Sequence, residues 1–196
     1  MSNIDFVNMH RYQAIEKVVY QKVKKWKPKT IVELGHGSGA LTVAMGLALK
    51  EINIEGKIYS YDINGTSHYT LGKMSESALS NIKKRELSNI VKFTKGSVFD
   101  TFVINPFPFD LLLIDIDNTW DILYNILISN NFINNEIKNG AKILVEGGDP
   151  NHPRINQDTL DFFNKSYGEK IFNITHLGGS GRTSISLLEI WINLKW

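Results

Sequence analysis

The chain has 196 residues, of which 42% are hydrophobic, enough for one sizeable core and little more. Its formal net charge of +2 gives no basis for binding nucleic acid or an anionic membrane surface. It contains no cysteine, which excludes disulfides, cysteine zinc sites and thiol nucleophiles. We therefore expect one domain over residues 1–196, in which a helical N-terminal segment (1–28) precedes the core (29–196). Because the chain shows no signal-peptide pattern and no apolar run of bilayer length, we also expect a cytoplasmic location.

The first predicted element is a helix over Asn8–Trp26. Its apolar residues recur at helical spacing, which predicts packing against the core: Ile15, Val18, Val19 and Val23. The helix ends in a basic run, KVKKWKPK, around Trp26. Such a run can bind nucleic acid, but positive charge in the last turn of a helix, followed by Pro28, is the commoner pattern. We interpret the run as a helix end.

The segment Thr30–Gly39, TIVELGHGSG, predicts a buried strand, a tight turn and a helix that starts at Ala40. Glycine occupies alternate positions in the turn: Gly35, Gly37 and Gly39. Without a Cβ atom the main chain can turn sharply, and a ligand can approach it where a side chain would stand in the way. The N-terminus of the following helix adds unpaired N–H groups that suit an electron-rich ligand. The position of the glycines between strand and helix makes this turn a candidate binding site.

A second strand, Lys57–Asp62, ends in an acidic residue at about the distance from the glycines that a ribose-binding carboxylate has. Such a carboxylate can accept hydrogen bonds from both hydroxyls of a ribose. The alternative is that Asp62 caps the following turn at Asn64 and Gly65. Because Asp62 follows the glycine turn at this spacing, ribose binding is the favoured interpretation.

Strand-like and helix-like stretches continue to alternate through the middle of the chain. We expect a polar helix, a strand, a buried strand, a helix and a buried strand, in this order: Ser75–Leu87, Ile90–Gly96, Asp110–Asp115, Trp120–Lys138 and Ala141–Gly148. This alternation predicts a parallel sheet with helices on both faces. Ligands of such sheets bind at the carboxyl ends of the strands. Most polar candidates are expected there: Glu33, Asp62, Ser97, Asp115, Asp117, Glu146 and Asp149.

The last part of the chain departs from this alternation. Ile171–Leu177 and Thr183–Ile192 both have strand-like patterns, and only GGSGR lies between them, too short for a crossover helix. The two segments therefore predict an antiparallel hairpin at one edge of the sheet. The glycine-rich link could also bind an anion through Arg182, but a hairpin connection is the simpler interpretation.

Taken together, these elements resemble a class I S-adenosylmethionine-dependent methyltransferase from about residue 10 onward. ELGHGSG (Glu33–Gly39) resembles the first motif of that family, YDIN its acidic second-strand motif, and NGAKILVEGG the segment of its fifth strand. The resemblance implies a Rossmann-like α/β fold: a three-layer sandwich with a mainly parallel seven-stranded sheet and an antiparallel C-terminal hairpin. FDLLLIDIDNTWDILYN is similar to the small-molecule O-methyltransferases of the catechol and caffeoyl-coenzyme A type.

The resemblance also implies which residues hold the cofactor, S-adenosylmethionine. Glu33 would be oriented toward its charged end, and Asp62 would hold the ribose hydroxyls. Asp115 would stand nearest the methyl donor. The other implied contacts are the glycine turn (Gly35, His36, Gly37 and Gly39), a cover for the adenine (Ile63) and the other side of the adenine (Ser97 and Val98).

Methyl transfer to a hydroxyl also needs a group that takes up its proton. The sulfonium already makes the methyl group electrophilic, so the protein chiefly has to orient the acceptor behind it. Three candidates for a catalytic role are expected on loops at the carboxyl edge: Asp115, Asp117 and His152.

A divalent metal ion is an alternative means of activating the acceptor. Metal-dependent relatives use an aspartate after the fourth strand and an Asp-Asn pair after the fifth. Asp115 matches the first, but Glu146 and Gly147 stand in place of the pair, so no metal is favoured. If one binds, we expect Asp115, Glu146 and Asp149 as its ligands.

The sequence therefore predicts a methyltransferase that acts on a small molecule, at oxygen in preference to nitrogen. NPFPF (Asn105–Phe109) is similar to the motif of enzymes that methylate nucleobase amines, but it precedes the fourth strand, so a packed strand start is expected. Two alternatives stay open: a nicotinamide-dependent oxidoreductase of the Rossmann type, and a cofactor-binding protein without turnover. Association of two copies as a homodimer is also left open.

Overall fold

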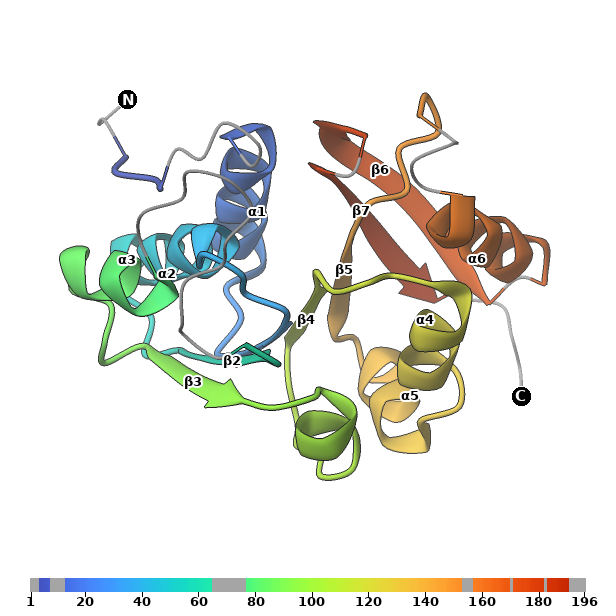
Figure 1. Cartoon of the computed structure of the whole chain (residues 1–196), viewed down its shortest axis with the longest axis horizontal. Helices are drawn as coiled ribbons and strands as arrows, with labels where there is room; N and C mark the ends of the chain where they lie inside the picture. The colour runs from blue at the N-terminus through green and yellow to red at the C-terminus, as the bar shows by residue number, and fades with distance from the viewer. Residues whose placement is uncertain are drawn as a thin grey trace.

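The computed structural model describes residues 4–7, 13–64, 77–152, 157–169, 171–181 and 183–190. In this part of the chain seven strands form one sheet in the order β3-β2-β1-β4-β5-β7-β6. The strands are β1 (Thr30–Leu34), β2 (Lys57–Asp62), β3 (Val91–Lys95), β4 (Leu111–Ile114), β5 (Lys142–Glu146), β6 (Phe172–Ser180) and β7 (Thr183–Ile190). The first five run parallel, and β7 is antiparallel to both β5 and β6. The predicted parallel sheet with an antiparallel C-terminal hairpin at one edge is confirmed (Figure 1).

Helices cover both faces of the sheet, which makes the predicted three-layer sandwich (Figure 1). Apolar side chains of α1 (Gln13–Trp26) and α2 (Ala40–Glu51) pack on one face, and α3 (Ala78–Lys84) packs against α2. The other face is covered by the π-helix η1 (Phe99–Val103), α4 (Trp120–Leu127), α5 (Asn131–Lys138) and α6 (Gln157–Gly168). No helix in the described ranges combines the length and the apolar character needed to cross a lipid bilayer.

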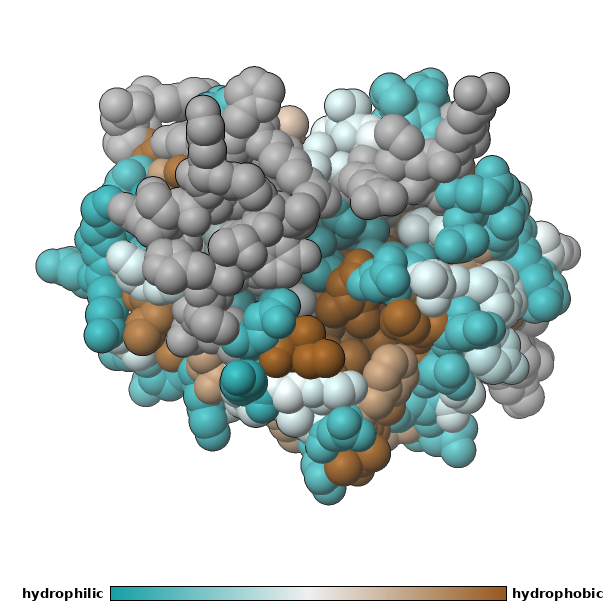
Figure 2. All heavy atoms as spheres, in the orientation of Figure 1, coloured by the Kyte–Doolittle hydropathy of each residue, from teal (hydrophilic) through white to brown (hydrophobic). Residues whose placement is uncertain are grey.

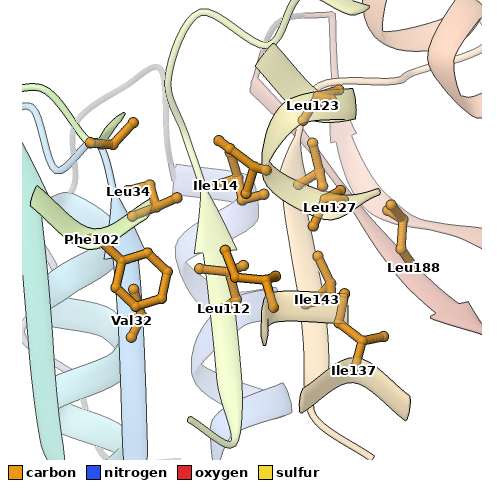
Figure 3. Close-up of a cluster of buried hydrophobic side chains, with 14 of the residues drawn as sticks. Val32, Leu34, Phe102, Leu112, Ile114, Leu123, Leu127, Ile137, Ile143 and Leu188 are labelled. Atoms are coloured by element: carbon orange, nitrogen blue, oxygen red, sulfur yellow. The ribbon is translucent and has the colours of Figure 1, made fainter. Parts of the chain in front are cut away.

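The two faces of the central strands are both buried. In Figure 3, side chains of β1, β4 and β5 meet Phe102 of η1 and Leu127 of α4 on one face; they include Val32, Leu112 and Ile143. Their neighbours along the strands pack toward α1 and α2 on the other face: Ile31, Leu111, Leu113 and Leu144. Burial on both sides explains why these strands read as continuous apolar runs and not as alternating ones.

The predicted single helix Trp120–Lys138 is wrong, because the structure has two helices, α4 and α5, with a break at residues 128–130. Asn130 has an extended backbone, and its side chain accepts a hydrogen bond from the N–H of Ile133 at 3.1 Å. A side chain that caps a new helix competes with continuation of the previous one. The apolar pattern runs through the break because both helices face the same core.

The first strand of the C-terminal hairpin extends further than predicted. β6 continues through Gly178 and Gly179, which pair with Ile185 and Ser184 of β7 after an irregularity that follows His176. The connection is therefore shorter than the predicted GGSGR link. Arg182, the predicted alternative anion ligand, lies outside the described residues, as do residues 191–192 of the predicted second strand.

Helix α6 was not predicted, although the sequence contains its signal. Its buried residues recur at helical spacing: Thr159, Phe162, Phe163 and Ser166. The Phe162 ring lies 5.3 Å from the ring of Trp120 in α4. In the chain, α6 follows β5 and precedes the hairpin, a stretch to which no helix was assigned from the pattern. Phe162 and Phe163 of the helix pack on the sheet.

The NPFPF segment packs at the start of β4 as expected. Phe109 is buried, and the ring centroid of Phe107 lies 4.8 Å from that of Tyr59. The remaining predicted elements agree in type: β2 has the predicted bounds Lys57–Asp62, and the others differ at one or both ends. Residues 8–12 of the predicted first helix and residues 75–76 of the predicted polar helix lie outside the described part of the chain.

Asp110 joins the starts of β1 and β4 at the edge of the sheet away from the glycine turn. Its Oδ2 atom accepts hydrogen bonds from the N–H groups of Lys29 and Thr30, both at 2.8 Å. We expect Asp110→Ala to lower the free energy of unfolding in urea by about 1–2 kcal/mol, because both amides lose their acceptor. Asp110→Asn, which keeps one acceptor oxygen, should cost less. Equal stability of Asp110→Ala and the wild type would contradict this role.

Candidate functional site

The glycine turn between β1 and α2 lies against the end of β4. Gly35 has φ of 84°, and a Cβ atom placed on it would lie 2.0 Å from the main-chain oxygen of Asp115. The main chains are also tied by hydrogen bonds, from Asp115 N–H to Leu34 at 2.8 Å and from Gly35 N–H to Tyr61 at 2.7 Å. Only glycine fits at this position, because the turn must pass directly over the strand end.

Asp62, at the end of β2, supports the same turn. Its Oδ2 atom accepts hydrogen bonds from the N–H groups of His36 at 3.2 Å and Gly37 at 3.0 Å. Its Oδ1 atom accepts one from the N–H of Asn64 at 2.8 Å, which is the turn-capping bond that the sequence offered as an alternative role. The bonds to the glycine turn were not predicted. Asp62 and Asp115 therefore lie on either side of one turn, at one edge of the sheet.

Gly37 leaves the turn open to a ligand. It has φ of 48°, and a Cβ atom built on it would have no heavy atom within 4 Å among the described residues. Gly39 differs, because its Cβ position would lie 3.1 Å from Ala78 of α3. Gly39 also precedes α2 without a side-chain cap for the first N–H groups of that helix. Among residues 35–42, Gly37 is the one that is not buried.

Glu33 lies beneath the turn and is completely buried. Its Oε2 atom accepts hydrogen bonds from Thr42 of α2 at 2.7 Å and Ser60 of β2 at 2.6 Å. Its Oε1 atom has no hydrogen-bond partner among the described residues. Burial raises the pKa of the Glu33 carboxyl from 4.5 to about 8; the two hydrogen bonds lower it, and the charges of Asp115 and Asp62 raise it.

Ser60 and Thr42 were missed as polar partners of Glu33. Ser60 pairs directly with Glu33 in the parallel register of β1 and β2, so two polar residues at matching positions of adjacent strands were the available signal. Ser60 also contacts the imidazole of His36, whose Nδ1 lies 2.8 Å from the Ser60 hydroxyl oxygen. The His36 ring packs on Phe93 of β3 at a centroid distance of 4.6 Å. His36 is therefore mostly buried, with its ring held between β2 and β3.

The predicted adenine contacts lie beside the turn at the ends of β2 and β3. The side chain of Ile63 is 67% exposed, whereas Val98 is buried. The N–H of Gly96 donates to the main-chain oxygen of Asp62 at 3.0 Å, and Ser97 accepts a hydrogen bond from the N–H of Phe99 at 3.2 Å. Figure 2 shows apolar atoms near the centre of this face of the molecule, over the ends of β2 and β4.

The loop after β4 carries Asp115, Asp117 and a residue that sequence reasoning missed, Asn118. Asp115 is half-buried against the turn, and Asp117 is exposed. Asn118 is buried and donates a hydrogen bond from Nδ2 to the main-chain oxygen of Glu146 at 2.7 Å. This bond joins the carboxyl ends of β4 and β5, so the loops that follow the two strands keep a defined separation.

The loop after β5 places His152 next to Asp149. The buried carboxylate of Asp149 accepts hydrogen bonds from His152 Nδ1 at 2.7 Å and from the N–H groups of Asn151 and Gly181 at 2.9 Å. Burial would raise the pKa of Asp149, but the bonds from Gly181, Asn151 and His152 together hold it down to about 2. The His152 side chain is half-exposed.

Of the three residues named as ligands in case a metal binds, Asp149 is held by other groups. The Asp149 carboxylate is engaged by the hairpin turn and by His152. Within the described ranges, no group of three or more His, Cys, Asp or Glu side chains could hold a metal ion. Asp115, Glu146 and Asp149 remain at the same edge of the sheet, after β4 and β5.

We expect Gly35→Ala to prevent the turn from packing on β4, because its Cβ atom would overlap the main chain of Asp115. The substitution should lower the free energy of unfolding by about 4 kcal/mol or more. Gly140→Ala is the matched control: φ is also positive, at 105°, but no heavy atom lies within 4 Å of the Cβ position. It should cost about 1–2 kcal/mol. Equal losses in chemical denaturation would contradict the packing argument.

The pKa of Glu33 makes stability depend on pH. Between about pH 4.5 and 8 the folded state keeps the Glu33 proton that the unfolded state has released. Over that range, stability of the wild type should fall by roughly 1.4 kcal/mol per pH unit relative to Glu33→Gln, and the difference should level off above pH 8. Urea denaturation at several pH values measures it. Glu55→Gln, at an exposed glutamate, should show the same pH dependence of stability as the wild type. If Glu33→Gln also shows the pH dependence of the wild type, the raised pKa of Glu33 is refuted.

Three solved structures are similar to this chain over most of its length. The O-methyltransferase TomG from Streptomyces achromogenes, involved in tomaymycin synthesis and solved with SAM, is 18% identical with a TM-score of 0.60, over 90% of this chain and 79% of TomG. SAH-bound PaMTH1 from Podospora anserina is 16% identical with a TM-score of 0.63, over 90% and 77%. An O-methyltransferase from Bacillus cereus in complex with SAH is 19% identical with a TM-score of 0.60, over 89% and 80%. At these identities the likeness concerns the fold.

A comparison with curated proteins found no match. A family model described as "Methyltransferase domain" matches residues 32–145, which run from β1 to β5 and include the glycine turn, Asp62 and Asp115. The match spans more than half of the 196 residues. With this turn, these two carboxylates and this fold, the chain belongs to the methyltransferase-domain family.

Proposed function

We propose that the protein transfers a methyl group from S-adenosylmethionine to the hydroxyl oxygen of a small molecule. The observation that carries the proposal is the glycine turn: Asp62 braces it from β2, Asp115 lies beneath it, and its main chain is open at Gly37. The three similar structures described above were solved with SAM or SAH. Membership of the methyltransferase-domain family favours this function over a nicotinamide-dependent oxidoreductase.

The residues at the turn fit a cofactor with an adenosyl group and an amino-acid tail. Space at the Cβ position of Gly37 lets a ligand reach the main chain, and the N-terminus of α2 adds N–H groups without a side-chain cap. Asp62 would hold the ribose, since each carboxylate oxygen can accept more than one hydrogen bond. The exposed side chain of Ile63 would cover the adenine, with Ser97 and Val98 on its other side.

The bound cofactor would supply a methyl group made electrophilic by the sulfonium. The task of the chain is then to orient the acceptor hydroxyl and to take up its proton. Orientation alone is worth about 7–11 kcal/mol in favourable cases. Asp115, Asp117 and His152 are the proposed proton acceptors, because all three lie after β4 or β5 at the edge that carries the turn. Asp149 would orient the imidazole of His152 through the bond to Nδ1.

The preference for a hydroxyl oxygen rests on the similar O-methyltransferases from Streptomyces achromogenes and Bacillus cereus. A small-molecule acceptor fits the proposed organisation as one domain, with a single continuous sheet. The sequence left association as a homodimer open.

Calorimetric titration with S-adenosylhomocysteine tests the proposal on the wild type, Gly37→Ala and Gly140→Ala. We expect binding by the wild type and at least tenfold weaker binding by Gly37→Ala, because the added Cβ atom occupies the open space over the turn. Both substitutions place alanine at positive φ, but only Gly37 lies at the site. Gly140→Ala should therefore bind like the wild type.

Two results would count against the proposed function. Binding of NAD without binding of S-adenosylhomocysteine would favour the oxidoreductase. Equal affinity of the wild type and Gly37→Ala would remove the glycine turn from the site. Methyl transfer to a panel of hydroxyl-bearing small molecules then distinguishes an enzyme from a protein that only binds the cofactor.

A further inference from the structure

We propose that Glu33, Ser60 and His36 form a buried proton relay, in which the protonation of Glu33 decides which ring nitrogen of His36 carries hydrogen. The relay would connect the interior of the sheet with the glycine turn. The relay itself is argued from the side chains alone, and its effect on ligand affinity rests on the proposed function.

The three side chains are connected in series through one hydroxyl group. The Ser60 oxygen lies 2.6 Å from Oε2 of Glu33 and 2.8 Å from Nδ1 of His36. Glu33 and Ser60 pair in register on adjacent strands, and Ser60 pairs with Phe93 on the next strand. The His36 ring packs on Phe93, so it is held over this row of residues. Both Glu33 and Ser60 are completely buried, so bulk water has no access to the connection.

Ser60 has a single hydrogen, which makes the two contacts depend on each other. If Glu33 is ionised, Ser60 donates to the carboxylate, and Nδ1–H of His36 donates to the Ser60 oxygen. If Glu33 is protonated, its O–H donates to Ser60, and Ser60 donates to a bare Nδ1; the neutral ring then carries its hydrogen on Nε2. The second state holds one more proton than the first.

The proton balance of the change is explicit. Nε2 of His36 gains a proton from outside the three side chains, the ring passes the Nδ1 hydrogen to Ser60, and Ser60 passes its own hydrogen to Glu33. The ring begins and ends neutral. The added proton therefore ends on Glu33, while His36 changes tautomer.

The surroundings favour this exchange near neutral pH. Burial raises the pKa of Glu33 to about 8, against the hydrogen bonds from Ser60 and Thr42. Further titratable groups that act on Glu33 are Asp115, after β4, and Asp62, at the end of β2, and both raise its pKa. α2 contributes the neutral hydroxyl of Thr42. A third carboxylate between the other two is thus held protonated up to the pH at which cells work.

His36 transmits the change to the turn. Its N–H and that of Gly37 donate to Asp62, and its main-chain oxygen accepts from the N–H of Gly39 at 2.6 Å. Above pH 8 the ionised Glu33 also adds a negative charge beneath the turn. If the proposed function is right, this charge favours the cationic cofactor over its neutral product, so the affinity ratio of S-adenosylmethionine to S-adenosylhomocysteine should rise severalfold with pH.

The relay can be tested by NMR on the full chain with 15N-labelled histidine. Long-range 1H–15N spectra between pH 6 and 9.5 distinguish the two neutral tautomers and the imidazolium. The chain has five histidines, and a His36→Gln spectrum identifies the signals of His36. We expect the Nε2–H tautomer at low pH and the Nδ1–H tautomer at high pH, with a midpoint near 8, the pKa of Glu33.

Variants separate the relay from a direct effect of pH on His36. Glu33→Gln should abolish the change of tautomer, whereas Glu55→Gln, at an exposed glutamate, should leave it unchanged. Ser60→Ala, which removes only the hydroxyl, should uncouple His36 even if Glu33→Gln does not fold. Thr42→Val should move the midpoint to higher pH, because the Thr42 hydrogen bond lowers the pKa of Glu33.

Three results would overturn the relay: one tautomer throughout the pH range, conversion of His36 to an imidazolium, or a change of tautomer that survives in Glu33→Gln. Calorimetry supplies the second measurement, the affinity ratio of S-adenosylmethionine to S-adenosylhomocysteine at pH 7 and 9. A ratio that rises in the wild type and stays constant in Glu33→Gln supports the effect on the site. Absence of binding of either compound at both pH values would refute the proposed function, and the NMR result would still decide the relay.

Discussion

The candidate site depends on the contact between the glycine turn and the ends of two strands. Asp62 of β2 accepts hydrogen bonds from the N–H groups of His36 and Gly37, and the main chain of Gly35 packs on that of Asp115 after β4. Because β2 and β4 flank β1 in the sheet, the turn that leaves β1 is held from both sides. A main-chain surface that is fixed in this way can receive a ligand with little loss of conformational entropy on binding.

The same arrangement collects negative charge, and the buried Glu33 shows the consequence. Burial, and to a smaller extent the charges of Asp115 and Asp62, raise the pKa of Glu33 to about 8, so it is kept protonated near neutral pH. Two hydroxyl groups satisfy one of its oxygen atoms. Asp149 is the opposite case: three hydrogen bonds hold its pKa down to about 2. Burial therefore outweighs the hydrogen bonds at Glu33, whereas the hydrogen bonds outweigh burial at Asp149.

The proposed cofactor site and one proposed proton acceptor lie in different parts of the chain. The segment that matches the methyltransferase-domain family runs from β1 to β5 and contains the turn with its two supporting strand ends. Asp149 and His152 follow β5, and Asp149 binds the N–H of Gly181 in the hairpin. The hairpin thus holds the loop that carries one proposed proton acceptor. Acceptor specificity in such folds is determined by loops of this kind.

The sequence by itself determined the alternation of strands and helices, the hairpin, the glycine turn and the edge at which Asp62 and Asp115 meet. These depend on local periodicity and on glycine positions, which are visible in a single chain. Only the tertiary structure decided that Asn130 divides a helix, that Asp62 supports the turn, and that Ser60 connects Glu33 with His36. The reason is physical: side-chain hydrogen bonds between strands depend on register and on the close approach of distant segments, and neither is encoded in the spacing of residues along the chain.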